Sequence, residues 1–247
     1  MSLLDIFKKK SLLPPSVLPL EVDIHSHLIP GIDDGIQTIE EGLDILRAMV
    51  DLGYKKIITT PHTMMESYPN TPEIINNGLK SMRKAIEQSN IPIKMEAATE
   101  YYLDESFIER LDNDEPLMTF GDNYVLFETS CINEPPFLKE ATFKMTVKGY
   151  KPVYAHPERC LYLIENDNLL EEMVDRDIFF QLNLNSLSGV YSKPVQKFAE
   201  KLIDRKIVSF VGTDCHHFGH MEYLEKTTQT KHFKKLLDLD LLNNTLL

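Results

Sequence analysis

The sequence has no tryptophan, only three cysteines among its 247 residues, and no hydrophobic run long enough to span a membrane. Cys131, Cys160 and Cys215 are too few and too scattered to form a disulfide scaffold, which indicates a reducing compartment. The first residues also lack the basic start and long apolar stretch of a secretory signal. These absences argue against a secreted disulfide-rich domain or a membrane-inserted protein, and we expect a cytoplasmic protein.

Positive charge is also scarce. Lysine and arginine total 26 against 38 aspartate and glutamate residues, which gives a formal net charge of −12. A general nucleic-acid-binding protein usually carries the opposite sign, so we expect no nucleic-acid partner. Anionic substrates remain compatible with this charge, because bound metal ions can reverse the local field. The 43% apolar and 26% charged residues are ordinary for a globular protein.

Apolar runs rich in β-branched and aromatic residues alternate with helical patterns along the chain. We expect seven strands, near residues 21–25, 55–60, 93–98, 124–128, 152–155, 178–184 and 207–212. Several runs are almost continuously apolar, as in parallel strands that are buried on both faces. The alternation predicts one α/β domain over residues 21–247, after a leader of residues 1–20. Seven strand–helix units favour a barrel over an open sheet.

Two of the expected helices have clear start signals. Thr38 begins a capping box ahead of an amphipathic stretch. Thr71 followed by Pro72 is typical of an N-cap with proline at the first helical position. Periodic stretches before Gly149 and over residues 192–206 predict two more helices.

Metal-capable side chains occur where the expected strands end. His25 and His27 follow the first strand, and residues two apart in an extended segment point to the same side, although an isolated pair is a weak signal. Asp34 lies in the loop after the same strand, and the later strands are followed or ended by His62, Glu100, Glu128, His156, Asp214 and His216. Only the sixth strand lacks an obvious ligand and offers Asn183 and Asn185. The carboxyl ends of the strands of a parallel barrel form one face, so we expect these candidates to converge there.

This number of candidate ligands exceeds the four that a single tetrahedral zinc needs. Three divalent cations that share a carboxylate would use them all. Their charge would outweigh that of the carboxylates, so the loaded pocket would attract a phosphate dianion despite the acidic surface. The mixed nitrogen and oxygen donors suit manganese, iron or zinc and do not choose among them.

Several motifs in combination carry a resemblance to a known family. The segments DIHSHLIPGIDDG, TTPH, TEYY, LFETS, AHPER and TDCHH resemble the PHP (polymerase and histidinol phosphatase) superfamily. Within it they are most similar to the bacterial tyrosine phosphatases of the CpsB/YwqE type, which act in capsule and exopolysaccharide systems. The resemblance extends from about Val22 to His220. It implies a distorted (β/α)7 TIM-like barrel with a trinuclear centre, manganese being the expected metal, at the C-terminal ends of the strands.

The resemblance also implies how the ligands divide among the cations. The expected sets are His25, His27, Glu100 and Asp214; the bridging Glu100 with Glu128 and His156; and Asp34, His62 and His216. Arg159, within AHPER, would bind the phosphate. These phosphatases commonly carry an arginine shortly after the last ligand segment, where this chain has His217 and His220 instead. His220 either faces the phosphate in its place or is a loop histidine.

The activity that the resemblance implies is hydrolysis of phosphotyrosine in a protein. The expected substrate is the tail of an autophosphorylated tyrosine kinase at the inner membrane face. The same metals would suit a small-molecule phosphatase, such as one acting on histidinol phosphate, or a non-catalytic metal-stabilised module that docks a kinase. A cysteine phosphatase is not expected, because it needs an arginine six residues after its nucleophile, and those positions are Phe137, Asn166 and Met221.

Overall fold

The computed structural model describes residues 18–247, so nearly all of the expected leader lies outside the described residues. The strands are β1 Val22–Asp23, β2 Lys56–Thr59, β3 His62–Thr63, β4 Lys94–Ala97, β5 Glu100–Tyr102, β6 Tyr124–Glu128, β7 Lys151–Ala155, β8 Phe179–Asn183 and β9 Val208–Gly212. The α-helices are α1 Ile39–Leu52, α2 Pro72–Gln88, α3 Glu105–Asp112, α4 Leu138–Val147, α5 Leu161–Glu165, α6 Asp167–Asp175, α7 Lys193–Asp204, α8 Gly219–Thr228 and α9 Lys231–Leu237. Short 3-10 helices are η2 Pro157–Arg159, η3 Leu184–Ser188 and η4 Asn243–Leu246. No described helix is both long and apolar enough to cross a membrane.

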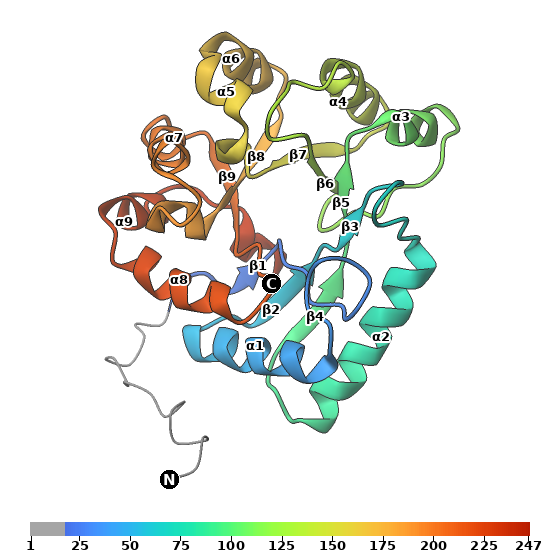
Figure 1. Cartoon of the computed structure of the whole chain (residues 1–247), viewed down its shortest axis with the longest axis vertical. Helices are drawn as coiled ribbons and strands as arrows, with labels where there is room; N and C mark the ends of the chain where they lie inside the picture. Colours follow the sequence, from blue (N-terminus) through green and yellow to red (C-terminus); the bar gives the residue numbers. More distant parts are fainter. Residues whose placement is uncertain (1–17) are drawn as a thin grey trace.

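The named strands pair in parallel and follow chain order around the fold, with helices arranged in a ring outside them (Figure 1). The second and third expected strands are observed as β2 and β4, and after an interruption each is followed by a further short strand, β3 after β2 and β5 after β4. Pro61 explains the first interruption, because proline has no N–H to donate to a neighbouring strand. Its carbonyl instead accepts hydrogen bonds from the Glu100 N–H at 3.1 Å and the Thr99 hydroxyl at 2.6 Å.

Hydrogen bonds between the first and last strand segments close the barrel near its carboxyl end. Asp214, just after β9, donates its N–H to the His25 carbonyl at 2.8 Å. His27 donates its N–H to the Cys215 carbonyl at 2.9 Å. The expected α/β barrel is therefore confirmed, and its closure brings the first and last candidate ligands together.

A buried asparagine side chain also joins β1 and β9. Asn243, in η4, donates through Nδ2 to the carbonyls of Val22 and Val211 at 3.0 and 2.8 Å. Its Oδ1 accepts from the Val211 N–H at 2.9 Å. This side chain therefore takes the place of backbone pairing between β1 and β9.

The two expected helix starts are confirmed. Thr38 accepts a hydrogen bond from the Glu41 N–H at 3.2 Å and begins α1. Thr71 accepts from the Ile74 N–H at 3.3 Å, and Pro72 is the first residue of α2. Each cap satisfies a backbone donor that the helix itself leaves unpaired.

The barrel interior changes from apolar to polar along the strands. Its apolar part consists of Val22, Ile24, Ile58, Ala98, Phe120, Leu126, Val153, Ala155 and Phe210. Two positions after Leu126 the chain has Glu128, and two positions after Ala98 it has Glu100. Alternate residues of a strand share a face, so the acids project from the same interior as the apolar layer. The apolar layer fills the amino end of the barrel and leaves the carboxyl end to polar side chains.

Candidate metal centre

Two histidines and two acids surround one point at the carboxyl face. His25 Nε2 lies 3.1 Å from Glu100 Oε2 and 3.4 Å from Asp214 Oδ1. His27 Nε2 lies 3.4 Å from His25 Nε2 and 3.5 Å from each of the same two oxygens. Four ligands at about 2.0–2.1 Å from a tetrahedral cation stand about 3.4 Å apart. These atoms therefore have the spacing of the first expected ligand set.

Glu100 is fully buried at the middle of the cluster. Its Oε2, which faces the first group, also lies 3.2 Å from His62 Nδ1, and its Oε1 lies 2.9 Å from His156 Nε2. Glu128 approaches from the neighbouring strand, with Oε1 3.0 Å from His62 Nδ1 and Oε2 3.9 Å from His156 Nε2. A carboxylate with one oxygen toward each of two groups suits the expected bridging role.

A third group lies on the more exposed side of the cluster. His62 Nε2 and His216 Nε2 each lie 3.4 Å from Oδ1 of Asp34, whose side chain is half exposed. The division differs from the expected one, because His27 also reaches this group and His62 also reaches the carboxylates of the second. All the expected ligands are nevertheless brought together at the carboxyl ends of the strands.

Two polar side chains orient the first pair of imidazoles. Gln181 Oε1 accepts from His25 Nδ1 at 2.7 Å, and Asp33 Oδ2 lies 2.8 Å from His27 Nδ1. Each contact turns the Nε2 atom toward the cluster, as partners of metal-binding histidines commonly do. Sequence reasoning missed both residues. The available signal for Gln181 was its alternation with Asn183 on an otherwise apolar strand.

Arg159 provides a positive charge at the edge of the cluster. Its Nη1 donates to Asp214 Oδ2 at 3.1 Å, and the guanidinium lies 5.0 Å from the ring centroid of Tyr191. One third of its side chain is exposed, so the group remains open to a ligand from solvent. The adjacent Glu158 is buried and accepts from the Asn183 N–H at 2.9 Å, which makes it a structural part of the same loop.

His220 lies against the loop that carries the last ligands. Its Nδ1 is 2.9 Å from the Asp214 carbonyl oxygen. Burial and the neighbouring His217 lower the pKa of His220, which favours an uncharged ring. Within residues 18–247 its Nε2 makes no hydrogen bond, so this nitrogen is the part of the ring open to a ligand.

The backbone at two candidate ligands is strained. His156 and Asp214 have positive φ angles of 35° and 49°, which non-glycine residues rarely adopt. Such conformations concentrate at functional sites, where the surrounding structure holds them. The backbone at Gly212 is closely packed against His25, because a Cβ added to this glycine would lie 2.5 Å from the Cβ of His25. The absence of a side chain at Gly212 thus makes room for an imidazole.

The buried acids and imidazoles perturb one another strongly. Burial and His27 lower the pKa of His62, but Glu100 and its neighbouring carboxylates outweigh them and raise it to about 10. Burial and Arg159 likewise act to lower the pKa of His156, but Glu100 outweighs them, so that this pKa is raised to about 9. These imidazoles therefore hold protons at neutral pH that a bound cation would displace.

The donor set fits divalent metal ions. Asp214 Oδ1 and His62 Nδ1 are buried and have no hydrogen-bond partner among the described residues. Buried polar atoms of this kind are unfavourable unless another group satisfies them, and a cation bound at each position would do so. Mixed imidazole and carboxylate donors suit manganese, iron and zinc.

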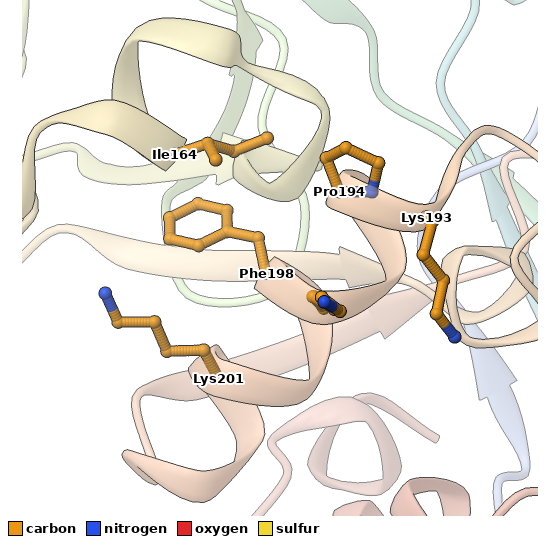
Figure 2. A pocket seen from close by; sticks show the side chains of 6 residues that line it. Ile164, Lys193, Pro194, Phe198 and Lys201 are labelled. Carbon is orange, nitrogen blue, oxygen red and sulfur yellow. The ribbon is translucent and has the colours of Figure 1, made fainter.

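The hollow drawn in Figure 2 lies elsewhere, on the outer wall between α5 and α7. It measures about 470 Å³. Its lining consists of Ile164, Lys193, Pro194, Lys197, Phe198 and Lys201. None of the candidate metal ligands is among these residues, so the metal cluster remains the candidate site.

Known proteins are similar to this chain over most of the barrel. Residues 21–237 match the family model described as capsular polysaccharide synthesis, CpsB/CapC. Tyrosine-protein phosphatase YwqE of Bacillus subtilis (strain 168) is 29% identical over 196 residues, which cover 79% of this chain and 77% of that protein. Tyrosine-protein phosphatase CpsB of Streptococcus pneumoniae is 26% identical over 202 residues, covering 79% of this chain and 83% of that protein.

Solved structures agree with this match. A structure from work on YwqE and CpsB of the same two species, described as unique metal-dependent tyrosine phosphatases, is similar at a TM-score of 0.80 and 26% identity. It covers 91% of this chain and 93% of that chain. A histidinol phosphate phosphatase of Lactococcus lactis has a TM-score of 0.51 at 13% identity, covering 84% and 94%, which shows a shared fold alone. Because the family model spans the barrel and every candidate ligand, the chain belongs to the CpsB/CapC family of capsular polysaccharide synthesis.

Proposed function

We propose that this chain is a metal-dependent protein tyrosine phosphatase. The observation that carries the proposal is the convergence of imidazoles and carboxylates around Glu100, with Arg159 at the exposed edge. Cleavage of a phosphate ester needs positive groups on the phosphoryl oxygens, which such a centre provides. The relatives that cover 79% of this chain are named tyrosine-protein phosphatases, which supports phosphotyrosine as the substrate.

We propose that three cations bind the cluster and that the division expected from the sequence applies. In it the ligands are His25, His27, Glu100 and Asp214; Glu100, Glu128 and His156; and Asp34, His62 and His216. Manganese is the first candidate, and iron or zinc would suit the same donors. The close approach of His27 and His62 to more than one group supports a compact centre rather than separate sites.

The chemistry divides between the cations and the chain. When bound, divalent cations lower the pKa of water and neutralise phosphoryl charge. Arg159 binds phosphoryl oxygens through its guanidinium, and Asp214 holds that group in place at 3.1 Å. Water adds to phosphorus as the bond to the phenolic oxygen breaks. Because a phenol has a pKa of about 10, its oxygen leaves with less acid assistance than an alkoxide needs.

His220 has a smaller role in this proposal. Its Nδ1 contacts the Asp214 carbonyl, so it positions the ligand loop, and only its Nε2 can reach a phosphate. Replacement of His220 by glutamine preserves a hydrogen-bonding side chain. We expect this variant to raise KM for the phosphate ester with little change in kcat if Nε2 contacts substrate. A change in metal affinity alone would assign His220 to the loop.

The substrate that we propose is the phosphorylated tail of a tyrosine kinase, which fits a family named for capsular polysaccharide synthesis. We place the enzyme in the cytoplasm, because its three free cysteines suit a reducing compartment. It would approach the membrane through the kinase without inserting, and it would need no nucleic-acid partner.

Metal removal and restoration test the proposal. The purified chain is stripped of metal, reloaded with manganese, iron or zinc, and assayed with a phosphotyrosine peptide and with histidinol phosphate. Elemental analysis counts the ions bound per chain. We expect metal-dependent hydrolysis of the peptide and about three ions, in keeping with the donor set. Faster hydrolysis of histidinol phosphate would favour a small-molecule phosphatase, and full loading without turnover would favour a non-catalytic docking module.

A further inference from the structure

Several exposed apolar side chains lie in the segments that follow the carboxyl ends of the strands. The exposed large hydrophobic residues of the described chain are Met65, Ile74, Ile132, Phe143, Val147, Leu161, Val190, Phe218 and Leu247. Five of them follow the carboxyl ends of strands, in loops or the first residues of helices. These five, which we call the apolar rim, are Met65, Ile132, Leu161, Val190 and Phe218. Carboxyl-end loops of a barrel surround its active site, so the apolar rim borders the metal centre.

Sequence neighbours tie the apolar rim to the site. Leu161 lies two positions after Arg159, and Phe218 lies two positions after His216. Val190 immediately precedes Tyr191, whose ring packs against the guanidinium of Arg159. The rim therefore continues outward from the residues proposed to bind phosphate and metal.

Hydrogen bonds between loops hold parts of the apolar rim in position. The Leu161 N–H donates to the Cys131 carbonyl at 2.8 Å, which joins the start of α5 to the loop that carries Ile132. Asn185 Nδ2 donates to the His220 carbonyl at 3.1 Å, which joins η3 and α8, the elements next to Val190 and Phe218. Rim side chains on loops joined in this way are partly pre-organised for a partner.

We propose that the apolar rim binds apolar residues that flank phosphotyrosine in a polypeptide substrate, an inference that rests on the proposed phosphatase function. Apolar side chains exposed beside a polar site offer contacts to the apolar parts of a ligand. A small phosphate ester has no neighbouring residues that could contact the loops. A polypeptide must cross the mouth of the barrel while its phosphotyrosine enters, so its neighbouring residues lie against the rim. The rim thus selects protein over small-molecule substrates.

The test compares three substrates in the metal-loaded full chain. Two peptides carry a central phosphotyrosine flanked either by leucines or by serines, and p-nitrophenyl phosphate has no flanks. The test variant is Ile132→Ser, and the matched control is Val147→Ser. Their side chains are 68% and 69% exposed, but Val147 ends α4 and lies near the amino end of the barrel. Circular dichroism and elemental analysis check that both variants fold and bind metal.

We expect the unmodified chain to prefer the leucine peptide through KM. The Ile132→Ser variant should raise KM for that peptide about five-fold, the effect of one interface contact, with p-nitrophenyl phosphate unchanged. Equal behaviour of Ile132→Ser and Val147→Ser on the leucine peptide would overturn the proposal. A change in oligomeric state by light scattering without a change in KM would also overturn it, in favour of self-association. Failure of the unmodified chain to hydrolyse any of the three substrates would refute the phosphatase function itself.

Discussion

The Nε2 atoms of His25 and His27 lie 3.4 Å apart, and the Nδ1 atom of each ring has its own polar partner. The two imidazoles are therefore aimed at one point by the protein alone. Pre-organised ligands lose little conformational freedom when a cation binds, which favours tight binding. The remaining donors at this point are buried acids, so the position strongly favours positive charge.

Loss of His25 should remove both metal and activity. We expect His25→Ala to lower kcat/KM for a phosphotyrosine peptide by more than about 100-fold. Loss of a residue that only orients a metal ligand costs about 10- to 100-fold, and loss of the ligand itself should cost more. The control is His232→Ala, since His232 lies on α9 beside Asp204, away from the cluster. Elemental analysis should show fewer ions in the first variant alone. Unchanged metal content and activity in His25→Ala would contradict the assignment.

Asp33 and Asp34 are adjacent but should behave differently. Asp33 contacts His27 Nδ1, whereas Asp34 faces the third group. We expect Asp33→Asn to weaken metal affinity about 10- to 100-fold, with activity recovered at saturating metal. Metal titration followed by turnover measures both effects. Asp44→Asn, which alters a surface pair on α1, is the control. If Asp33→Asn and Asp44→Asn bind metal with equal affinity, Asp33 does not position His27.

Replacement of Arg159 should affect phosphate binding and turnover rather than metal binding. We expect Arg159→Ala to lower kcat/KM about 100-fold, in the range for removing one oxyanion-stabilising group. The bound metal should stay the same, as measured by elemental analysis. Arg159→Lys should recover only part of the activity, because lysine lacks the bidentate guanidinium. Replacement of Arg205, which pairs with Glu171 on the surface, should leave turnover unchanged. Loss of metal in Arg159→Ala would instead assign the residue to supporting Asp214.

The thiols should be dispensable for turnover. The neighbouring Cys160 lowers the pKa of Cys131, so Cys131 is the thiol to test first. The residue six positions later is nevertheless Phe137, so the chain lacks the arginine of a cysteine phosphatase loop. We expect Cys131→Ser to keep activity within about two-fold, as surface or half-buried substitutions away from the chemistry usually do. Complete loss of peptide hydrolysis with full metal loading would point to a thiol nucleophile.

Asn243 should be important for stability. Replacement by alanine removes three hydrogen bonds and leaves the buried N–H of Val211 without its partner. We expect the free energy of unfolding to fall by about 2–4 kcal/mol, measured by urea denaturation. Asn244→Ala is the matched control, because the side chain of Asn244 makes its hydrogen bonds at the exposed surface. Equal losses in the two variants would show that Asn243 does not join the barrel seam.

Much of the fold and the ligand set could be predicted from the sequence. Buried parallel strands produce nearly continuous apolar runs, and a polar residue after such a run stands out. His62 and Glu128 were recognisable for this reason. The fold then requires that residues at equivalent strand ends share one face, which placed distant residues such as His25 and Asp214 together.

Other features depend on contacts that local patterns do not encode. Gln181 orients His25 across the barrel, and no spacing rule links positions 156 residues apart. The overlap of ligand groups at His62 likewise follows from ring orientation. Asn243 joins the first and last strands although its own segment is a short 3-10 helix with no special sequence signal. Tertiary packing decides each of these contacts.

The hydrogen bond between His27 and Cys215 that helps to close the barrel also bears on how the protein is synthesised. At a synthesis rate of about 5–20 residues per second, the ribosome needs about 10–40 s to extend the chain from the first ligands to the last. During that interval His25 and His27 have emerged without Asp214, so the first group is incomplete. A prematurely released fragment would carry scattered histidines but no finished pocket. The first ligand group can therefore be completed only in a nearly complete polypeptide, which would make loading of that group a late step in synthesis of the protein.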